Sequence, residues 1–376
     1  MTMPSTRLIA LAAGGTAGHV FPAVALAREL EARGYRLALV TDRRGGAISG
    51  LDNIDVHHVS AGGLAGKSLM RRAASVAELG FGVLQARGIL KRLRPDAVIG
   101  FGGYASVPPM IAASLLKTRT AIHEQNAVLG RANRLLAGSV DRIALSFENS
   151  RELPEGVIGK TVHTGMPVRP EIAALGAMLR RSSEDGRVSI LVTGGSQGAS
   201  ILSEVVPAAV AALDAADQSR LRIVQQCRSE DLEAVRSTYV RLAADVQLAS
   251  FFDDMPDRIA EADLMICRSG ASSVAEALAA GRPAILVPYP YAIDDHQSAN
   301  AHAVAEAGAG WLMDQSIFTA DRLAERLRAF LTTPRLIETA ANAARRAGRA
   351  DAAARLANMV EDLVNGDTGG DRRTAA

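Results

Sequence analysis

The sequence predicts an α/β protein that contains two Rossmann-like units, each with a parallel β-sheet. Short apolar segments alternate along the chain with alanine-rich segments of helical composition, which is typical of parallel sheets with helices on both faces. The series restarts near residue 188. In both halves a strand candidate leads into a Gly-Gly-x-x-Gly turn and then a helix, at residues 11–18 and 192–198. The wide spacing of these turns indicates a duplicated unit rather than a short solenoid repeat.

Length and composition agree with this class. The chain has 376 residues, which at about 150 residues per domain predicts about two to three domains, and its 48% hydrophobic content allows a sizeable core. The net charge is only +2, from 42 basic and 40 acidic residues, which argues against a general nucleic-acid-binding protein. Two cysteines, Cys227 and Cys267, are too few for a disulfide framework, so we expect a reducing compartment.

Two apolar segments have to be compared with membrane signals. Residues 8–13 are too short for the core of a signal peptide and are better explained as the first buried strand. Residues 97–116 contain no charged residue and are long enough to span a bilayer. Because glycines and the pair Pro108-Pro109 interrupt this segment, we predict a strand, a turn and a helix there, and no transmembrane helix.

The predicted strands are the short apolar runs that end at a glycine or polar turn. Those of the first half are residues 8–13, 36–41, 97–101, 120–123 and 142–145. Those of the second half are residues 188–192, 221–225, 263–267 and 283–287. After residue 340 the composition is helical until Asn365, and residues 367–376 are expected to form a disordered tail.

Three glycine-rich turns are candidates for phosphate binding, because glycines at a strand end let backbone N–H groups approach a phosphate at a helix N-terminus. The strict G-x-G-x-x-G pattern is absent at residues 14–18 and 194–198. Two turns in register nevertheless favour a ligand-binding crevice over simple packing. The third turn, Gly102-Gly103, fits an anion site or an unliganded exit from a strand equally well.

Polar residues after strands of the first half each have two interpretations. His19 follows the first turn, where an imidazole is suited to take a proton from a hydroxyl, or is merely a polar residue that caps the helix. Residues 123–126, His-Glu-Gln-Asn, belong either to a ligand site at the carboxyl edge of the sheet or to a buried hydrogen-bond cluster. Their spacing does not match a zinc site.

In the second half, serine and glycine follow Cys267 and leave helix N–H groups available for an anion. Glu276, further along the same helix, is suited to accept two hydrogen bonds from a ribose diol, or is an ordinary helical glutamate.

A second polar segment of this half follows the strand candidate 283–287. Gln297 and Asn300 are expected on one helical face, which suits a polyhydroxyl ligand. The pair Asp294-Asp295 is interpreted as the start of that helix rather than as a metal site.

Residues 67–94 combine seven basic residues with one acidic residue, Glu78. Leucine, valine and other apolar residues are interleaved with them. Such a segment can rest on an anionic membrane surface, or it can be a core-facing amphipathic helix with a solvated basic face.

Eight segments together resemble the MurG family, which are family 28 glycosyltransferases of peptidoglycan synthesis. They occur in the family's order and cover nearly the whole chain, so their combination is specific although each alone is weak. The segments are AAGGTAGHVFPA (12–23), GFGGYASVPP (100–109), HEQNAVLGRANR (123–134), TGMPVR (164–169), GGSQGA (194–199), FFDDM (251–255), CRSGASSVAE (267–276) and DDHQSANA (294–301).

The resemblance implies a GT-B fold, in which two Rossmann-like domains face each other across a cleft and a C-terminal helix returns to the first domain. It implies a membrane-facing acceptor domain at 1–168, completed by 346–366, and a domain at 169–345 that binds UDP-N-acetylglucosamine. The implied reaction is inverting transfer of N-acetylglucosamine to the muramic acid 4-hydroxyl of lipid I, which gives lipid II. A UDP-N-acetylglucosamine 2-epimerase and a non-catalytic UDP-sugar-binding membrane adaptor are the alternatives.

Site residues carry over by position. The resemblance implies His19 as the catalytic base, and Arg169 and Ser196 as contacts of the donor diphosphate. Glu276 is implied to contact the ribose, and Phe252 to offer backbone groups to uracil. The other implied donor residues are Thr16, Ala17, Gly18, Asn126, Ala271, Ser272, Ser273, Val274, Ala275 and Gln297. The implied site of the acceptor diphosphate is Gly14, Gly15, Gly102, Gly103 and Tyr104.

The resemblance further implies an enzyme without cofactor or metal, bound peripherally at the cytoplasmic face of the bacterial inner membrane. Its implied partners are UDP-N-acetylglucosamine, lipid I, the anionic lipids of that membrane, and other proteins of cell-wall synthesis and cell division, but not nucleic acid. One departure lies at Cys227-Arg228, where the family often has a more polar, glycine-containing stretch. A nucleotide contact from this strand is therefore not transferred.

Overall fold

The computed structural model describes residues 7–14, 17–42, 54–61, 69–178, 186–195 and 198–366. The chain divides into two compact units. Unit 1 consists of Met1–Pro167 together with Asp351–Ala376, and unit 2 consists of Val168–Ala350.

Within its described residues, unit 1 is built on a seven-stranded sheet of order β3-β2-β1-β4-β5-β6-β7, and neighbouring strands pair in parallel. The strands are β1 (Leu8–Ala12), β2 (Arg36–Thr41), β3 (Asp55–His58), β4 (Ala97–Gly100), β5 (Arg119–Glu124), β6 (Arg142–Leu145) and β7 (Thr161–His163). The helical segments are α1 (Ala17–Ala32), α2 (Leu69–Leu93), η2 (Tyr104–Ser106), α3 (Val107–Leu115), α4 (Arg131–Leu136), η3 (Glu155–Lys160) and α14 (Ala352–Asn365).

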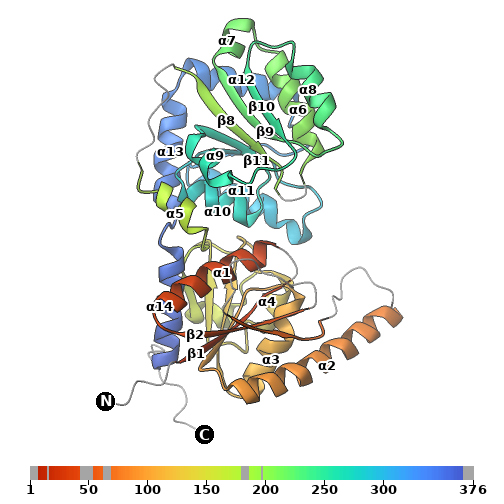
Figure 1. Ribbon diagram of the computed structural model, residues 1–376, viewed down its shortest axis with the longest axis vertical. Coiled ribbons are helices and arrows are strands. Elements are labelled where there is room, and N and C mark those ends of the chain that lie inside the picture. The colour runs from red at the N-terminus through yellow and green to blue at the C-terminus, as the bar shows by residue number, and fades with distance from the viewer. Residues whose placement is uncertain are drawn as a thin grey trace. The chain divides into compact units, whose positions relative to one another are not determined.

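Helices cover both faces of this sheet because successive side chains of a strand point to opposite sides. Ile9 and Leu11 of β1 pack in one cluster with residues of α1 and α14, which lie side by side (Figure 1). Ala10 and Ala12 belong to a second cluster that includes residues of α2 and α3. The C-terminal helix is therefore part of the core of unit 1.

Within its described residues, unit 2 has a six-stranded parallel sheet of order β10-β9-β8-β11-β12-β13. The strands are β8 (Val188–Thr193), β9 (Leu221–Gln226), β10 (Asp245–Ala249), β11 (Leu264–Cys267), β12 (Ala284–Leu286) and β13 (Gly310–Leu312). The helical segments are α5 (Pro170–Leu175), α6 (Ser200–Ala211), α7 (Ala215–Ser219), α8 (Leu232–Tyr239), α9 (Met255–Glu261), α10 (Ala271–Ala279), η4 (Ile293–Asp295), α11 (His296–Glu306), α12 (Ala320–Thr332) and α13 (Arg335–Ala347).

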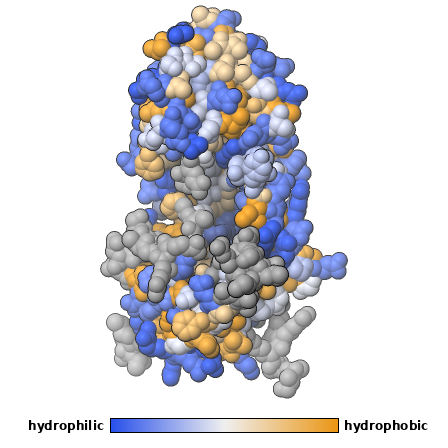
Figure 2. Space-filling model, turned by 90° about the vertical axis from the view of Figure 1, so that its right-hand side faces the viewer, coloured by the Kyte–Doolittle hydropathy of each residue, from blue (hydrophilic) through white to orange (hydrophobic). Residues whose placement is uncertain are grey.

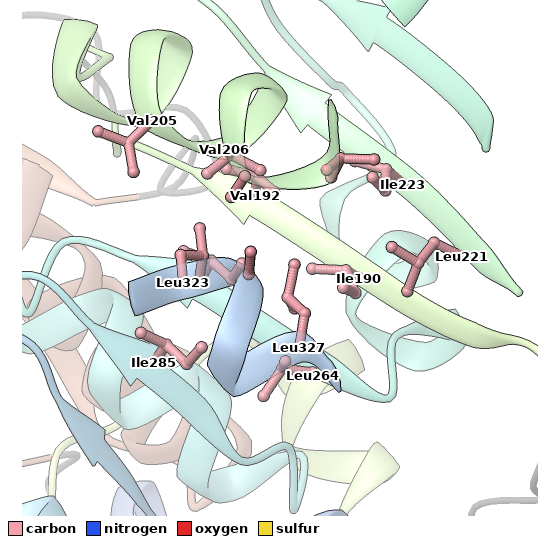
Figure 3. Packing of buried hydrophobic residues seen from close by; sticks show 14 of the residues in the cluster. Ile190, Val192, Val205, Val206, Leu221, Ile223, Leu264, Ile285, Leu323 and Leu327 are labelled. Carbon is pink, nitrogen blue, oxygen red and sulfur yellow. The ribbon is translucent and has the colours of Figure 1, made fainter. Parts of the chain in front are cut away.

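The largest core cluster of unit 2 lies between the sheet and the helices α6 and α12. Ile190 and Ile285 extend from the strands toward the side chains of Leu323 and Leu327 on α12, and Val206 of α6 packs near Val192 (Figure 3). All of these side chains are buried. The apolar runs predicted as strands therefore form the interior of the unit.

Every strand predicted from the sequence is present, with small shifts of the ends. Four described strands were not predicted, namely β3, β7, β10 and β13, and each of them lies at an edge of its sheet. The segment 97–116 forms β4, η2 and α3, with Pro108 and Pro109 in the first turn of α3, as predicted. No helix in the described part of the chain is both long and apolar enough to cross a membrane.

The strand orders locate a candidate site in each unit. In unit 1 the order reverses between β1 and β4, and in unit 2 between β8 and β11. Ligands of open parallel sheets bind beyond the carboxyl ends of the strands at such a reversal. The glycine turns at residues 14, 102–103 and 194–195 follow β1, β4 and β8, so the predicted turns lie at these points.

Candidate functional site

In unit 1, His19 lies in the first turn of α1, against the glycine turn that follows β4. A Cβ atom on Gly102 would come within 3.4 Å of His19 Cε1, and one on Gly103 within 3.2 Å of His19 Cδ2. Both glycines have positive φ values, +79° and +69°. Both positions therefore require glycine for two reasons: the backbone has a positive φ, and a Cβ atom would crowd the imidazole.

The imidazole of His19 is partly exposed and contacts the end of β5. Its Nδ1 lies 3.2 Å from Oε1 of Gln125. Nε2 of Gln125 in turn lies 2.9 Å from the carbonyl oxygen of Phe101. Through Gln125, His19 is thus connected to the ends of β5 and β4, across the strand-order reversal from β1.

The segment 123–126 forms a buried hydrogen-bond cluster, the second of its two interpretations. The carboxylate of Glu124 accepts hydrogen bonds from the backbone N–H groups of Asn126 (3.0 Å) and Gly130 (2.8 Å) and from Nδ2 of Asn133 (2.8 Å). His123, Glu124 and Gln125 are all buried. Nε2 of His123 lies 3.1 Å from the carbonyl oxygen of Gly165, and burial lowers the pKa of His123 to about 4. His123 is therefore neutral at neutral pH.

The other residues predicted for the first half lie around this cluster. Asn126 is half-buried, and its Nδ2 donates to Glu124 Oε1 at 3.3 Å. Gly14 packs tightly, since a Cβ there would come 2.7 Å from Cβ of Ala105. Ala17 and Gly18 begin α1, and Tyr104 begins η2. Gly15 and Thr16 lie outside the described residues.

In unit 2, two predicted donor-binding residues contact each other. Arg169, directly before α5, approaches Oε1 of Glu276 in α10 through Nε at 3.1 Å and Nη2 at 3.0 Å. Burial raises the pKa of Glu276, and the guanidinium of Arg169 opposes that rise. A half-buried carboxylate and an arginine thus form one polar site beside the helix.

The first turns of α10 offer mainly backbone to a ligand. Gly270 precedes the helix, and Ala271, Ser272 and Ser273 are only half-buried. Val274 is buried in the interior of the unit, so its side chain is not available to a nucleotide, while Ala275 is half-buried. Cys267, before this turn, is a core residue as expected, and burial raises the pKa of its thiol to about 12.

Phe252 also has a buried side chain, whose ring lies 5.2 Å from the guanidinium carbon of Arg258. Only the backbone of Phe252 is therefore suited to contact a base.

Gln297 and Asn300 both lie in α11 with the predicted spacing, but the expectation that both side chains face a ligand is wrong for Asn300. Asn300 is fully buried and donates from Nδ2 to the carbonyl oxygen of Ser269 at 3.0 Å, so it links α11 to the turn before α10. Gln297 accepts a hydrogen bond at Oε1 from the backbone N–H of Tyr289 at 2.9 Å. Asp295 precedes α11 and accepts from the hydroxyl of Ser298 at 2.6 Å, which agrees with a helix start.

Arg228 is a basic residue at the second glycine turn that the sequence prediction missed. A Cβ on Gly198 would come 2.5 Å from Cγ of Arg228, so the arginine side chain lies over this glycine. Its guanidinium donates to the hydroxyl of Ser200 at 2.8 Å and pairs with Glu230. The sequence signal for it was a basic residue two positions after the end of β9. Ser196 lies outside the described residues.

No three His, Cys, Asp or Glu side chains in the described ranges lie close enough to hold a metal ion. The groups that the candidate residues offer to a ligand are an imidazole, an arginine, a carboxylate and helix N-termini.

Two family models match this chain. Residues 9–145 match the glycosyltransferase family 28 N-terminal domain, and residues 189–356 match the family 28 C-terminal domain. The chain belongs to glycosyltransferase family 28. The resemblance inferred from the eight segments is thereby confirmed, and this family 28 chain is a glycosyltransferase.

Curated relatives support the same family over nearly the full length. A protein of Paramagnetospirillum magneticum is 57% identical over 96% of this family 28 chain and 98% of its own length. One of Rhodospirillum rubrum is 54% identical over 94% of this chain and 91% of its own length. Both are named UDP-N-acetylglucosamine--N-acetylmuramyl-(pentapeptide) pyrophosphoryl-undecaprenol N-acetylglucosamine transferase.

Solved structures agree with the fold. The crystal structure of MurG from Acinetobacter baumannii matches with a TM-score of 0.79 and 31% identity, over 95% of this family 28 chain and 99% of its own. A UDP-GlcNAc 2-epimerase from Neisseria meningitidis matches with a TM-score of 0.66 and 14% identity, over 96% of this chain and 100% of its own. The second match shows the fold alone. The GT-B prediction is confirmed.

Proposed function

We propose that this family 28 enzyme transfers N-acetylglucosamine from UDP-N-acetylglucosamine to the muramic acid 4-hydroxyl of undecaprenyl-diphospho-muramoylpentapeptide, lipid I, and so produces lipid II for the cell wall. The observation that carries the proposal is the 57% identity to a transferase of that name over 96% of the chain. The transfer inverts the anomeric centre.

The donor binds to unit 2 in this proposal. Arg169 and Glu276 now contact each other, and both have chemistry that a nucleoside diphosphate satisfies. The diphosphate offers anionic oxygens to the guanidinium, and the ribose diol offers two hydroxyl donors to the carboxylate. Donor binding exchanges the ion pair for these contacts. Gln297 holds the sugar, and the backbone of Phe252 contacts uracil.

The acceptor binds to unit 1. The turns at Gly14 and Gly102-Gly103, with Tyr104, receive the lipid I diphosphate, and His19 removes the proton from the attacking hydroxyl. As the bond from the anomeric carbon to UDP breaks, negative charge grows on the diphosphate. Arg169 and the N-termini of α6 and α10 stabilise this charge.

Unit 1 also contacts the membrane in this proposal. On α2, Phe81 and Leu84 are 57% and 66% exposed although both are large and apolar. Among the described side chains, Arg87, Lys91 and Arg92 of α2 are also exposed, as is Arg94 just after the helix. Hydrophobic residues also lie among hydrophilic ones on the face of unit 1 seen in Figure 2. This mixture suits an anionic bilayer at the cytoplasmic side of the inner membrane, where lipid I resides.

The first experiment measures UDP release from UDP-N-acetylglucosamine in EDTA, with and without a lipid I analogue. We expect release only with the acceptor, together with a disaccharide-lipid product. Release of UDP without acceptor would indicate epimerase chemistry instead. Donor binding without any release would indicate a binding protein.

A further inference from the structure

The orientation of the Gln125 amide is determined by its neighbours. Its nitrogen Nε2 lies 2.9 Å from the carbonyl oxygen of Phe101 and 3.1 Å from the carbonyl oxygen of His123. Carbonyl oxygens only accept hydrogen bonds, so the NH₂ group must face them. The amide oxygen Oε1 therefore faces Nδ1 of His19, 3.2 Å away.

This orientation selects one tautomer of His19. An amide oxygen has no hydrogen to donate, so the contact is a hydrogen bond only when Nδ1 of His19 carries the proton. A neutral imidazole has one N–H group, and its other nitrogen has the lone pair. In the neutral ring held by Gln125, that nitrogen is Nε2.

The contacts of His123 support the same orientation of the Gln125 amide. Its Nδ1 lies 3.1 Å from Nε2 of Gln125, and its Nε2 lies 3.1 Å from the carbonyl oxygen of Gly165. Since that oxygen only accepts, Nε2 of His123 carries the proton and Nδ1 is an acceptor. Burial keeps His123 neutral, because its pKa is lowered to about 4. Each donor in this chain of contacts thus meets an acceptor.

We propose that Gln125 is a positioning residue for the transfer: it holds His19 in the tautomer with the proton on Nδ1 and makes Nε2 the nitrogen that takes the acceptor's proton. This inference rests on the proposed function only in taking His19 as the base. As the 4-hydroxyl oxygen bonds to the anomeric carbon, its proton moves to Nε2, and the bond to UDP breaks with its electron pair leaving on the diphosphate. The imidazolium that forms keeps its Nδ1–H bond to Oε1 of Gln125, which favours its positive charge.

The test replaces Gln125 in two ways and uses a matched control. Gln125→Met keeps an unbranched side chain but removes both the amide donor and the acceptor oxygen, whereas Gln125→Glu keeps an oxygen opposite Nδ1. The control is Gln218→Met in unit 2. Gln218 is also buried, donates from Nε2 to the carbonyl oxygens of Val210 (3.2 Å) and Leu213 (2.9 Å), and accepts from the N–H of Ala243 (3.0 Å).

Three quantities are measured for each variant: turnover with a lipid I analogue, affinity for UDP-N-acetylglucosamine, and the tautomer of His19 from ¹⁵N-histidine NMR spectra assigned with His19→Ala. We expect Gln125→Met to lower kcat on the order of 10- to 100-fold, part of the effect of a general base, with donor affinity kept. The Nδ1–H signature of His19 should be lost in this variant. Gln125→Glu should recover part of the lost turnover, and Gln218→Met should change neither turnover nor tautomer.

The inference is overturned if His19 keeps its Nδ1–H tautomer in Gln125→Met. It is also overturned if the turnover of Gln125→Glu, divided by the fraction of protein that binds donor, is as low as that of Gln125→Met. A carboxylate would face the carbonyl oxygens of Phe101 and His123 and could not replace an amide that served structure alone. Recovery of turnover by Gln125→Glu would therefore depend on its oxygen opposite His19. Failure of the proposed base role looks different: His19→Ala would then keep its turnover, while the NMR spectra would still report whether Gln125 sets the tautomer.

Discussion

Replacement of Arg169 by alanine tests the ion pair that joins the segment before α5 to α10. The Arg169 and Glu276 side chains are 32% and 16% exposed, so the pair is only partly buried. Removing one partner of a fully buried pair costs about 3–5 kcal/mol, and solvent reduces that figure here. Two contacts to a charged oxygen are lost, and we expect the free energy of unfolding of unit 2 to fall by about 2 kcal/mol at neutral pH.

The expected loss depends on pH because Glu276 stays behind. Burial already raises the pKa of Glu276, and Arg169 opposes this rise, so the pKa rises further in the variant. A carboxyl group with a higher pKa in the folded state binds more protons when folded. Stability therefore falls as pH rises from the unfolded pKa to the folded pKa, and it is restored below the unfolded pKa. The difference between wild type and Arg169→Ala should shrink as pH is lowered toward about 4.

Denaturant unfolding followed by tryptophan fluorescence measures this difference in the right unit, since the one tryptophan of the chain, Trp311, lies in β13. Arg236→Ala is the control, because its pair with Glu233 in α8 is exposed and is worth less than about 1 kcal/mol at any pH. The double variant Arg169→Ala/Glu276→Gln should lose the pH dependence. A loss in Arg169→Ala that is equal at pH 4.5 and 7.5, or no larger than that of Arg236→Ala, refutes the reasoning.

Three further predictions follow from the candidate site. His19→Ala should lower turnover on the order of 10²- to 10⁴-fold and leave UDP-N-acetylglucosamine affinity unchanged in a binding titration; intact turnover would exclude the base role. Gly103→Ala places a Cβ 3.1 Å from the carbonyl oxygen of Gly14 and 3.2 Å from His19, so kcat should fall. The control Gly34→Ala has a comparable positive φ but no atom within 4 Å of the new Cβ, so it should lose a similar amount of stability, about 1–2 kcal/mol as expected for a left-handed residue, and keep its kcat. Equal kcat values in the two variants would contradict the packing argument. Phe81→Ser/Leu84→Ser should reduce sedimentation with anionic vesicles while turnover of a soluble acceptor persists; binding as strong as that of the control Leu115→Ser, another exposed leucine of unit 1, would remove α2 from the membrane contact.

The interior of both sheets could be predicted from sequence, and the edges could not. Central strands are covered on both faces, so they appear as continuous apolar runs such as residues 97–101. The edge strands β3 and β10 contain exposed residues along their lengths, and β7 is only three residues long. Their pairing depends on a neighbour that is distant in sequence, and a local pattern does not contain that information.

The candidate site shows the same division. Glycine turns and His19 stand directly after predicted strands, so sequence order placed them correctly. Helical spacing placed Gln297 and Asn300 on one face, but it did not show that the amide of Asn300 donates a hydrogen bond to the backbone carbonyl of Ser269. Nor did spacing show that Arg169 and Glu276, 107 positions apart, share a bond. Contacts between remote segments need the packed tertiary structure.

The last described helix, α14, packs on α1, and Arg33, the residue directly after α1, pairs with Glu361 of α14 at 2.8 Å. Unit 1 thus contains the earliest and the latest described parts of the chain, while unit 2 is a single continuous stretch. During synthesis on the ribosome, the cluster that contains Ile9, Leu11 and Leu26 lacks its α14 members, among them Leu356 and Val360, until the end of the chain has emerged. Unit 2 is complete in sequence before that point, so the half of the enzyme that is translated first is the half that finishes folding last.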